Sequence, residues 1–348
     1  MQLIDGPCVS FLTLENDSYG VGYRAGSGHI KIIPRNASRV AQVLCAILPK
    51  MVRTVAVLVA AVALISASAA CGGGPTASAG SLNVVAGENF WGSIATQLGG
   101  SKVNVQSVVT DPNADPHEYE SNTNDARAFA QADLVILNGA GYDDWGKKLL
   151  DANSSSHRKV VNVADLLGKK AGDNPHFWYD AQYVIQLADA ITADYKSIDR
   201  ADVSYFDQQR VAFGHALEPY FVAIADIRDK YAGVAIGSTE SIFFYMASLL
   251  GLNLISPPEF MDAVAEGNDP PAAAVVEFQN QVTKHQIKVL VYNNQTVTAV
   301  TTHIKQMAES NKISLVGVSE TLHPLTATFQ DWQMSQLKQL ATALTLQS

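Results

Sequence analysis

Two histidines of this chain lie in nearly identical local sequences. One stretch reads Asp115-Pro116-His117-Glu118-Tyr119-Glu120, and the other reads Asn174-Pro175-His176-Phe177-Trp178. Each histidine directly follows a proline, with an acidic or amide residue before the proline and an aromatic residue two positions after the histidine. Proline restricts φ and keeps the preceding residue extended, so the backbone aims each imidazole rigidly. Imidazole is the commonest metal ligand in proteins, and two rigidly aimed imidazoles indicate a metal site.

Two glutamates stand at comparable places in the second half of the chain. Glu240 follows the apolar run Val234–Gly237, and Glu320 follows the run Leu315–Val318. The histidine motifs also follow such runs, and ligands of open α/β sheets bind beyond the carboxyl ends of strands. Two imidazoles and two carboxylates are a donor set that suits Zn²⁺ or Mn²⁺. Taken alone, however, such a glutamate is also typical of a helix N-terminus, and a single histidine of an ordinary core or surface position.

Apolar, β-branched runs alternate with amphipathic stretches from Leu82 onward. The runs predict eight strands, at Leu82–Ala86, Val103–Val109, Leu134–Asn138, Val160–Val163, Val234–Gly237, Leu252–Ile255, Val289–Tyr292 and Leu315–Val318. The amphipathic stretches predict helices at Phe90–Leu98, Thr123–Gln131, Ala181–Tyr195, Ala272–Lys284, Thr296–Ser310 and Trp332–Leu346. Strands that alternate with helices form βαβ units, in which helices cover both faces of a parallel sheet.

One segment, Arg200–Tyr231, breaks this alternation. Its apolar residues recur at steps of mostly three and four residues, which predicts a single long helix, bent at Pro219. Four predicted strands precede this helix and four follow it. We therefore expect an α/β protein with two (β/α) sandwich lobes, residues 82–199 and 232–348, each built on a mainly parallel four-stranded sheet. The long helix over residues 200–231 would join them.

The residues before these lobes predict export. A charge-poor run of Val, Ala, Leu and Ile follows Met51-Val52-Arg53, so we interpret residues 51–70 as a signal peptide. Cys71 and the Gly, Pro, Ser and Thr residues after it resemble a bacterial lipobox, which predicts a lipid on Cys71 and a flexible tether over residues 71–81. Simple secretion is the alternative, because Ser68 stands where a lipobox usually has a bulky apolar residue.

Residues 1–50 lie before the predicted signal and show no sustained periodicity. We interpret them as a non-native extension, with Met51 as the true start. Two of the three cysteines, Cys8 and Cys45, fall in this extension, and none follows Cys71. The lobes therefore lack both disulfides and thiolate ligands, so His, Asp and Glu must hold any metal.

The overall charge limits the kinds of partner. A formal net charge of −9 argues against nucleic acid, which would favour a basic patch. An acidic surface suits a protein that handles cations, although it also commonly serves solubility.

The motifs together resemble those of a known family. The chain resembles the metal-binding lipoproteins of bacterial zinc and manganese ABC importers in four features. They are the motif Asp-Pro-His-x-Tyr-Glu, the motif Asn-Pro-His-x-Trp, Glu240 eleven residues before Gly251, and Ser-Glu-Thr after the last strand. The resemblance covers Leu82 to Leu346, as well as the lipobox and tether. It implies two (β/α) lobes joined by a rigid helix, which the pattern of residues 200–231 independently predicts.

The resemblance also implies a ligand set and a function. The ligands would be His117, His176, Glu240 and Glu320, although some members have histidine where Glu240 stands and many have aspartate where Glu320 stands. The chain would be a binding protein and not an enzyme, an extracytoplasmic monomer anchored to the outer face of the membrane through Cys71. It would bind Zn²⁺ or Mn²⁺, with zinc slightly favoured, and deliver the ion to a cognate ABC permease.

Two other functions stay open from the residues themselves. A secreted metal-dependent hydrolase would need a general base, for which Glu118 is the obvious candidate, but the chain has no His-Glu-x-x-His motif. A surface adhesin would carry its metal only incidentally. The segment Gly141–Lys148 nearly fits a phosphate-binding loop, but we interpret it as a packed turn because Asp143 and Asp144 would repel phosphate.

The neighbours of the two motifs have predicted supporting roles. We expect Tyr119 and Trp178 to wall the metal site. We expect Glu120 and Asp180 to cap helices. Four histidines of the lobes fall on helical or loop patterns and are interpreted as surface residues, namely His157, His215, His285 and His303. His323 lies three residues after Glu320 and is a minor further candidate for a ligand.

Overall fold

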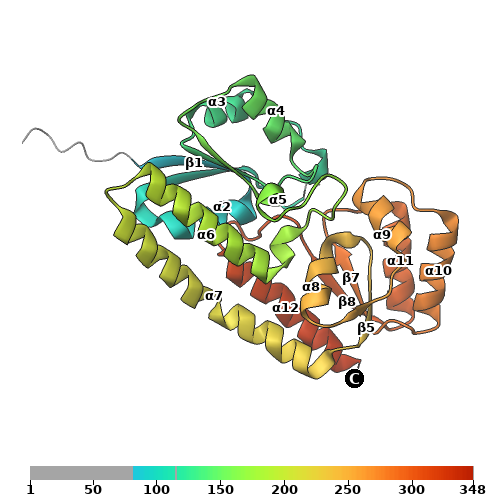
Figure 1. Cartoon of the computed structure of the whole chain (residues 1–348). Helices are drawn as coiled ribbons and strands as arrows, with labels where there is room; N and C mark the ends of the chain where they lie inside the picture. The colour runs from blue at the N-terminus through green and yellow to red at the C-terminus, as the bar shows by residue number, and fades with distance from the viewer. Residues whose placement is uncertain (1–80, 114–115, 348) are drawn as a thin grey trace, which may run out of the picture. The chain divides into compact units, whose positions relative to one another are not determined.

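A computed structural model describes residues 81–113 and 116–347, all of which fall within one compact unit. The described strands form two parallel sheets of four strands each (Figure 1). The first sheet contains β1 (Leu82–Glu88), β2 (Val103–Val109), β3 (Leu134–Leu137) and β4 (Lys159–Asn162) in the order β2-β1-β3-β4. The second contains β5 (Ala235–Ser238), β6 (Asn253–Leu254), β7 (Val289–Asn293) and β8 (Ser314–Val318) in the order β6-β5-β7-β8.

The two sheets repeat one connectivity. In each, the first strand pairs with the second on one side and with the third on the other, and every pairing is parallel. The chain therefore changes direction along the sheet after its second strand, which leaves a crevice beyond the carboxyl ends of the strands. All four residues of β3 are buried, as the helices on both faces of a parallel sheet require.

Helices connect the strands within each lobe. The first lobe has α2 (Asn89–Gly99), α3 (Thr123–Gln131), α4 (Asp144–Ala152), α5 (Val163–Leu166), α6 (Ala181–Ile198) and the short 3₁₀ turns η1 (Gly100–Lys102), η2 (Pro116–Glu118) and η3 (Phe177–Tyr179). The second has η4 (Ser241–Phe243), α8 (Phe244–Leu249), α9 (Pro258–Ala265), α10 (Ala272–Thr283), α11 (Ala299–Ser310) and α12 (Phe329–Leu346).

Local capping fixes where two of these helices begin. The Asn122 side chain accepts the Asn124 backbone N–H at the start of α3, and the Asp125 carboxylate accepts the Asn122 backbone N–H, which completes a capping box. The cap of this helix is therefore Asn122 and not Glu120. Asp180 accepts hydrogen bonds from the backbone N–H groups of Gln182 and Tyr183, so it caps α6 as predicted.

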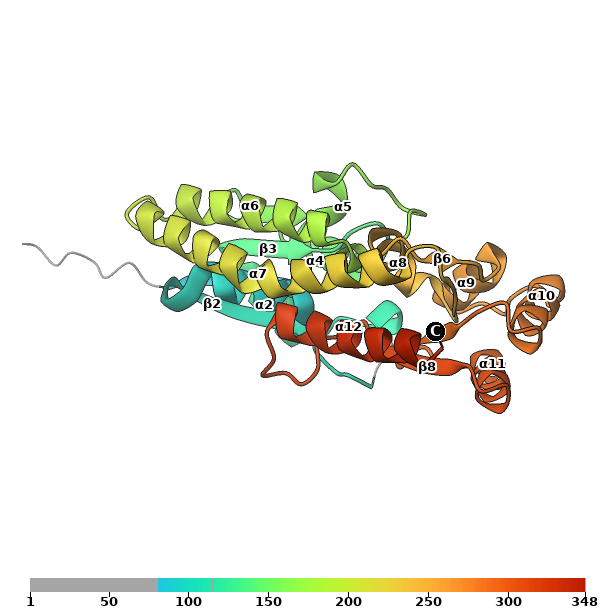
Figure 2. The ribbon, with the colours of Figure 1, turned by 90° about the horizontal axis from the view of Figure 1, so that it is seen from below.

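One long helix, α7 (Val203–Tyr231), joins the lobes and runs through Pro219. The last helix, α12, packs along α7 and also contacts α2 and β8 (Figure 2). A single hydrophobic cluster contains residues from β1, β3, α7, β7, β8 and α12, so the apolar core is continuous from one lobe to the other. Continuous packing of this kind resists independent motion of the lobes.

The sequence predicted the fold class correctly. All eight expected strands are present, and their ends differ from the prediction by at most two residues. The joining helix begins at Val203 instead of Arg200. The segment Gly141–Lys148 was interpreted as a turn, whereas the helix α4 already begins within it, at Asp144.

The predictions for residues 1–50, the signal peptide over 51–70, and Cys71 with its tether lie outside the described residues, apart from Ser81. Within residues 81–113 and 116–347, no helix combines the length and the apolar character that crossing a membrane requires.

Candidate metal centre

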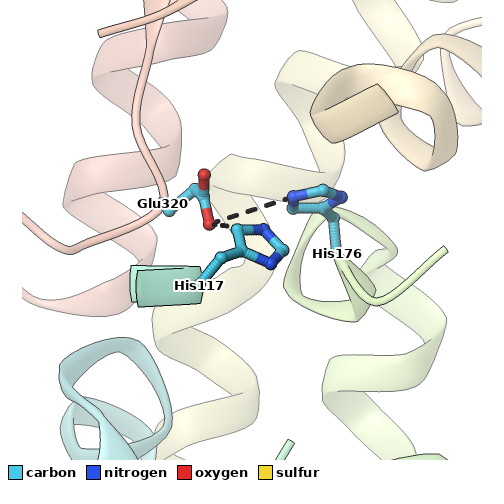
Figure 3. Close-up of side chains that lie close together, drawn as sticks. All are labelled: His117, His176 and Glu320. Atoms are coloured by element: carbon cyan, nitrogen blue, oxygen red, sulfur yellow. Dashed lines mark ion pairs between the residues drawn. The ribbon is translucent and has the colours of Figure 1, made fainter. Parts of the chain in front are cut away.

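The four predicted ligands all follow strands at the carboxyl edges of the two sheets. His117 lies on η2, after β2, and His176 directly precedes η3, after β4. Glu240 lies between β5 and η4, and Glu320 follows β8. Each lobe thus contributes two side chains to the crevice (Figure 3 shows His117, His176 and Glu320).

Three of these side chains converge closely. The ligand atoms of His117, His176 and Glu320 all lie within 4.8 Å of one another. Glu320 Oε2 is 3.4 Å from His117 Nε2 and 3.9 Å from His176 Nε2 (Figure 3). Glu240 is not part of this mutual group, but its Oε1 lies 3.3 Å from His176 Nε2. His176 therefore stands between the two carboxylates.

The ring of His176 is oriented by Asn174 from its own motif. Asn174 Oδ1 accepts the His176 backbone N–H at 3.0 Å and lies 2.8 Å from His176 Nδ1. Asn174 Nδ2 donates to the Ser241 carbonyl at 2.8 Å, which fixes the orientation of the amide. Because Oδ1 can only accept, the proton of His176 belongs on Nδ1, and the Nε2 lone pair faces the carboxylates.

Burial sets the charge state of His176. The side chain is fully buried, and this burial lowers the pKa of His176 to about 3 although the nearby Glu320 carboxylate favours its charged form. The imidazole is therefore neutral near pH 7, which is the form that binds a metal ion.

The two carboxylates are also fully buried, and their pKa values shift in opposite directions. Burial and the charge of Glu320 raise the pKa of Glu240. Burial alone would raise the pKa of Glu320, but His117, His176 and a hydrogen bond from Tyr142 together lower it. The Tyr142 hydroxyl donates to Glu320 Oε2 at 2.7 Å. A second hydrogen-bond donor, Asn293 Nδ2, lies 2.8 Å from Glu240 Oε2 and 2.6 Å from Glu320 Oε1.

Two buried atoms at the centre of this cluster have no hydrogen-bond partner. They are His176 Nε2 and Glu240 Oε1, which face one another. Buried polar atoms without partners are rare and require an explanation, and a bound cation supplies one. In a tetrahedral Zn²⁺ site, neighbouring donor atoms are about 3.3–3.5 Å apart. Two of the measured separations, 3.4 Å and 3.3 Å, match this spacing, so the donor set fits a divalent ion.

A cavity of about 280 Å³ adjoins the cluster, and His117 and Tyr142 form part of its lining. Three carboxylates, Asp173, Asp262 and Glu266, also line it. Their negative charge favours entry of a cation over entry of an anion.

The aromatic neighbours differ in part from the sequence prediction. Trp178 is fully buried and its ring centroid lies 5.2 Å from that of His176, as expected for a wall of the site. Tyr119 instead packs against Trp145 and donates to Asp125, away from the predicted role. The wall beside His117 is Tyr142, whose ring centroid lies 4.6 Å from that of His117.

Two residues that contact the carboxylates, Tyr142 and Asn293, were not among the predicted site residues. Asn293 ends β7, and Tyr142 follows β3, so both stand where the strand-end rule looks for functional groups. Extending that rule to every predicted strand would have found both residues.

The remaining candidates lie elsewhere. Glu118 is exposed and does not belong to the cluster of ligand atoms. Four other histidines are exposed, as predicted: His157, His215, His285 and His303. His323, the minor further candidate, is also exposed and does not belong to the cluster of ligand atoms.

Comparison with known proteins agrees with this two-lobed fold. The chain belongs to the family described as zinc-uptake complex component A, periplasmic, which matches residues 84–343. Among its relatives, the manganese ABC transporter substrate-binding lipoprotein PsaA of Streptococcus pneumoniae is 25% identical over 205 residues, or 55% of this chain and 66% of the relative. The metal ABC transporter substrate-binding lipoprotein ScbA of Streptococcus cristatus is 30% identical over 145 residues, or 38% and 46%. The chain therefore spans about half to two thirds of the length of these relatives.

Solved structures share the fold. The periplasmic zinc-binding protein TroA of Treponema pallidum superposes with a TM-score of 0.65 at 14% identity, over 76% of this chain and 99% of that one. A Mn-bound periplasmic metal-binding protein of Candidatus Liberibacter asiaticus gives 0.62 at 18% identity, over 75% and 98%.

Proposed function

We propose that this protein captures a divalent transition metal between its two lobes, outside the cytoplasmic membrane, and delivers it to an ABC permease. The observation that carries the proposal is the cluster of His117, His176, Glu240 and Glu320, in which two facing buried atoms lack hydrogen-bond partners. The names of the relatives support the transport role, because they are substrate-binding lipoproteins of metal ABC transporters.

We assign all four side chains as ligands, including Glu240, which needs to shift toward the other three. The ion is Zn²⁺ or Mn²⁺, with zinc slightly favoured because two imidazoles and the general affinity order favour it. Relatives named for manganese and a fold neighbour named for zinc support this pair of ions.

The protein acts as a binding protein and not as a hydrolase. Four protein ligands leave no position for a reacting water, whereas catalytic zinc typically has three protein ligands. The one candidate base, Glu118, is exposed and outside the cluster. An adhesin with an incidental metal would not need buried ligands from two lobes.

Release of the ion must disrupt contacts that cross between the lobes. Besides Tyr142 and Glu320, the side chain of Asn89 exchanges two hydrogen bonds with the Leu322 backbone, at 3.0 Å and 2.8 Å. Tyr179 also donates to the Ser319 carbonyl at 2.9 Å. These contacts and the continuous core favour a small opening, which the permease would induce by binding the open form more tightly.

The proposal also includes the mature arrangement of the chain. It is a monomer held at the outer face of the membrane by a lipid on Cys71, after removal of residues 51–70. Its lobes are residues 82–199 and 232–348, with residues 200–231 between them.

Metal titration of the full chain after chelator treatment tests the proposal. We expect one Zn²⁺ or Mn²⁺ per chain, and loss of binding in His117→Ala, His176→Ala and Glu320→Ala. The matched control is His303→Ala, because His303 is exposed and outside the cluster. Equal binding by the control and the three site variants would contradict the proposal.

A further inference from the structure

The side chain of Asn293 connects the two carboxylates of the second lobe. It ends β7 and is 2% exposed. Its Nδ2 atom lies 2.8 Å from Glu240 Oε2 and 2.6 Å from Glu320 Oε1, and Thr296 Oγ1 lies 2.9 Å from the same nitrogen. One amide group therefore holds one oxygen of each carboxylate.

The orientation of this amide is fixed by its surroundings. Asn293 Oδ1 accepts the backbone N–H of Gln295 at 3.0 Å, so the NH₂ group must face the carboxylates. The Gln295 side chain in turn accepts the backbone N–H groups of Glu320 at 2.7 Å and Thr321 at 3.0 Å. The turn after β7 thus positions both the backbone and the carboxylate of Glu320.

The oxygens that Asn293 does not hold are the ones nearest the histidines. Glu240 Oε1 lies 3.3 Å from His176 Nε2, and Glu320 Oε2 lies 3.4 Å from His117 Nε2. A carboxylate that binds an ion through both oxygens must turn both toward it. Asn293 opposes such a turn of either carboxylate, because Glu240 and Glu320 would each lose a buried hydrogen bond to its amide.

We propose that Asn293 makes both glutamates single-oxygen ligands and thereby selects for ions that accept four donors. The inference rests on the proposed function and adds the choice of ion. Two histidine nitrogens and two carboxylate oxygens complete the tetrahedral shell of Zn²⁺. Mn²⁺ favours six donors in octahedral geometry, which this set supplies only if the carboxylates bind through both oxygens or waters enter.

Tyr142 reinforces the restriction on Glu320. Its hydroxyl donates to Oε2, the oxygen that faces His117, at 2.7 Å. A carboxylate oxygen has two lone pairs, so this hydrogen bond leaves one of them for the ion.

Competition titration with Zn²⁺ and Mn²⁺ on the full chain tests the proposal. Asn293→Ala removes the amide, and the matched control Asn294→Ala removes the same group from the next, exposed position. Loss of an outer hydrogen-bond partner typically lowers metal affinity by about 10–100-fold. We expect Asn293→Ala to lose that much Zn²⁺ affinity and to keep its Mn²⁺ affinity, so that the Zn²⁺ to Mn²⁺ preference falls by the same factor of about 10–100.

The coordination number supplies a second readout, which a merely structural role would not change. We expect X-ray absorption of the Zn²⁺-loaded wild-type protein to give four light-atom donors. Co²⁺ should give the intense visible bands of a four-coordinate ion, and these should weaken in Asn293→Ala. The wild-type measurement tests the proposal even if the variant fails to fold.

The outcomes separate this inference from the proposed function. Failure of the wild-type chain to bind either ion would contradict the function itself. Binding with five or six donors in the wild type, or an unchanged ion preference in a folded Asn293→Ala, would overturn the role of Asn293 alone.

Discussion

Replacing Asn174 with alanine tests how the site prepares His176 for a metal ion. The Asn174 side chain accepts the Nδ1 proton at 2.8 Å, which keeps the Nε2 lone pair free. Without it, the proton can move to Nε2, where Glu240 Oε1 lies 3.3 Å away as an acceptor. That tautomer blocks the metal, because the ion would have to displace the Nε2 proton.

The expected loss follows from these contacts. Removing an outer partner of a metal-bound histidine lowers affinity by about 10–100-fold, or about 1.4–2.7 kcal/mol. The variant also loses the bonds to the His176 backbone N–H and to the Ser241 carbonyl. At about 1 kcal/mol for each hydrogen bond, Asn174→Ala should destabilise the metal-free protein by about 2–3 kcal/mol.

Two measurements separate the change in tautomer from a general loss of stability. Competition with a chromogenic chelator gives the affinity, and ¹⁵N NMR of the imidazole gives the tautomer. The matched control is Tyr245→Phe, since the Tyr245 hydroxyl donates at 2.8 Å to the backbone carbonyl of Asn174 and does not touch the His176 ring. We expect Tyr245→Phe to lose about 1 kcal/mol of stability and to keep its metal affinity within about twofold.

If folded Asn174→Ala binds Zn²⁺ as tightly as the wild type and its His176 Nε2 stays unprotonated, Asn174 does not select the tautomer. Equal loss of affinity in Asn174→Ala and Tyr245→Phe would assign the effect to stability alone.

Three further predictions concern the ion, a carboxylate ligand and pH. Adding Zn²⁺ at about 100 times its Kd should stabilise the metal-free protein by about 2.7 kcal/mol and raise its Tm by roughly 5–10 °C. An unchanged Tm in calorimetry would count against the metal site. Glu320→Gln should lower Zn²⁺ affinity at least about 100-fold in a metal titration. An amide that keeps its oxygen toward Asn293 turns its NH₂ group toward the ion, and that group cannot bind it. A Kd near the wild-type value would exclude Glu320 as a ligand. Burial and the nearby Asp143 raise the pKa of Glu88 well above its ordinary value, so the folded state retains a proton that the unfolded state loses, and stability falls as pH rises above about 4.5. In urea unfolding of the metal-free protein, the free energy of unfolding of Glu88→Gln should therefore rise relative to that of the wild type between pH 5 and pH 8. A difference between the two proteins that does not change with pH would show that Glu88 is not the titrating group.

Much of the fold is encoded in local patterns. The β-branched runs and the 3.6-residue periodicity of the long helix identify the eight strands and α7 without reference to any contact. Local patterns do not encode the order of the strands within each sheet, because that order depends on which helices pack on which face. The helix α4 was also hidden, since its first turn follows a Gly-rich segment that by itself is typical of a turn.

For the candidate site too, local sequence predicts some features and not others. His117 and His176 can be found because stiff Pro-His motifs repeat, and Glu240 and Glu320 can be found because they follow strands. Tyr142 and Asn293 also stand at strand ends, but their position in the sequence does not show which carboxylate each one contacts. Tyr142 donates to Glu320 across 178 positions of sequence, and Asn293 bridges glutamates 53 and 27 positions away.

The sequence by itself therefore determined which side chains could bind a metal, because residue type and strand position are local properties. Only the tertiary structure decided which lone pairs and which carboxylate oxygens face the ion. That choice depends on hydrogen bonds with Asn174, Tyr142 and Asn293, which lie in three separate segments of the chain. Burial then gives those bonds their strength, because no water competes for the same atoms.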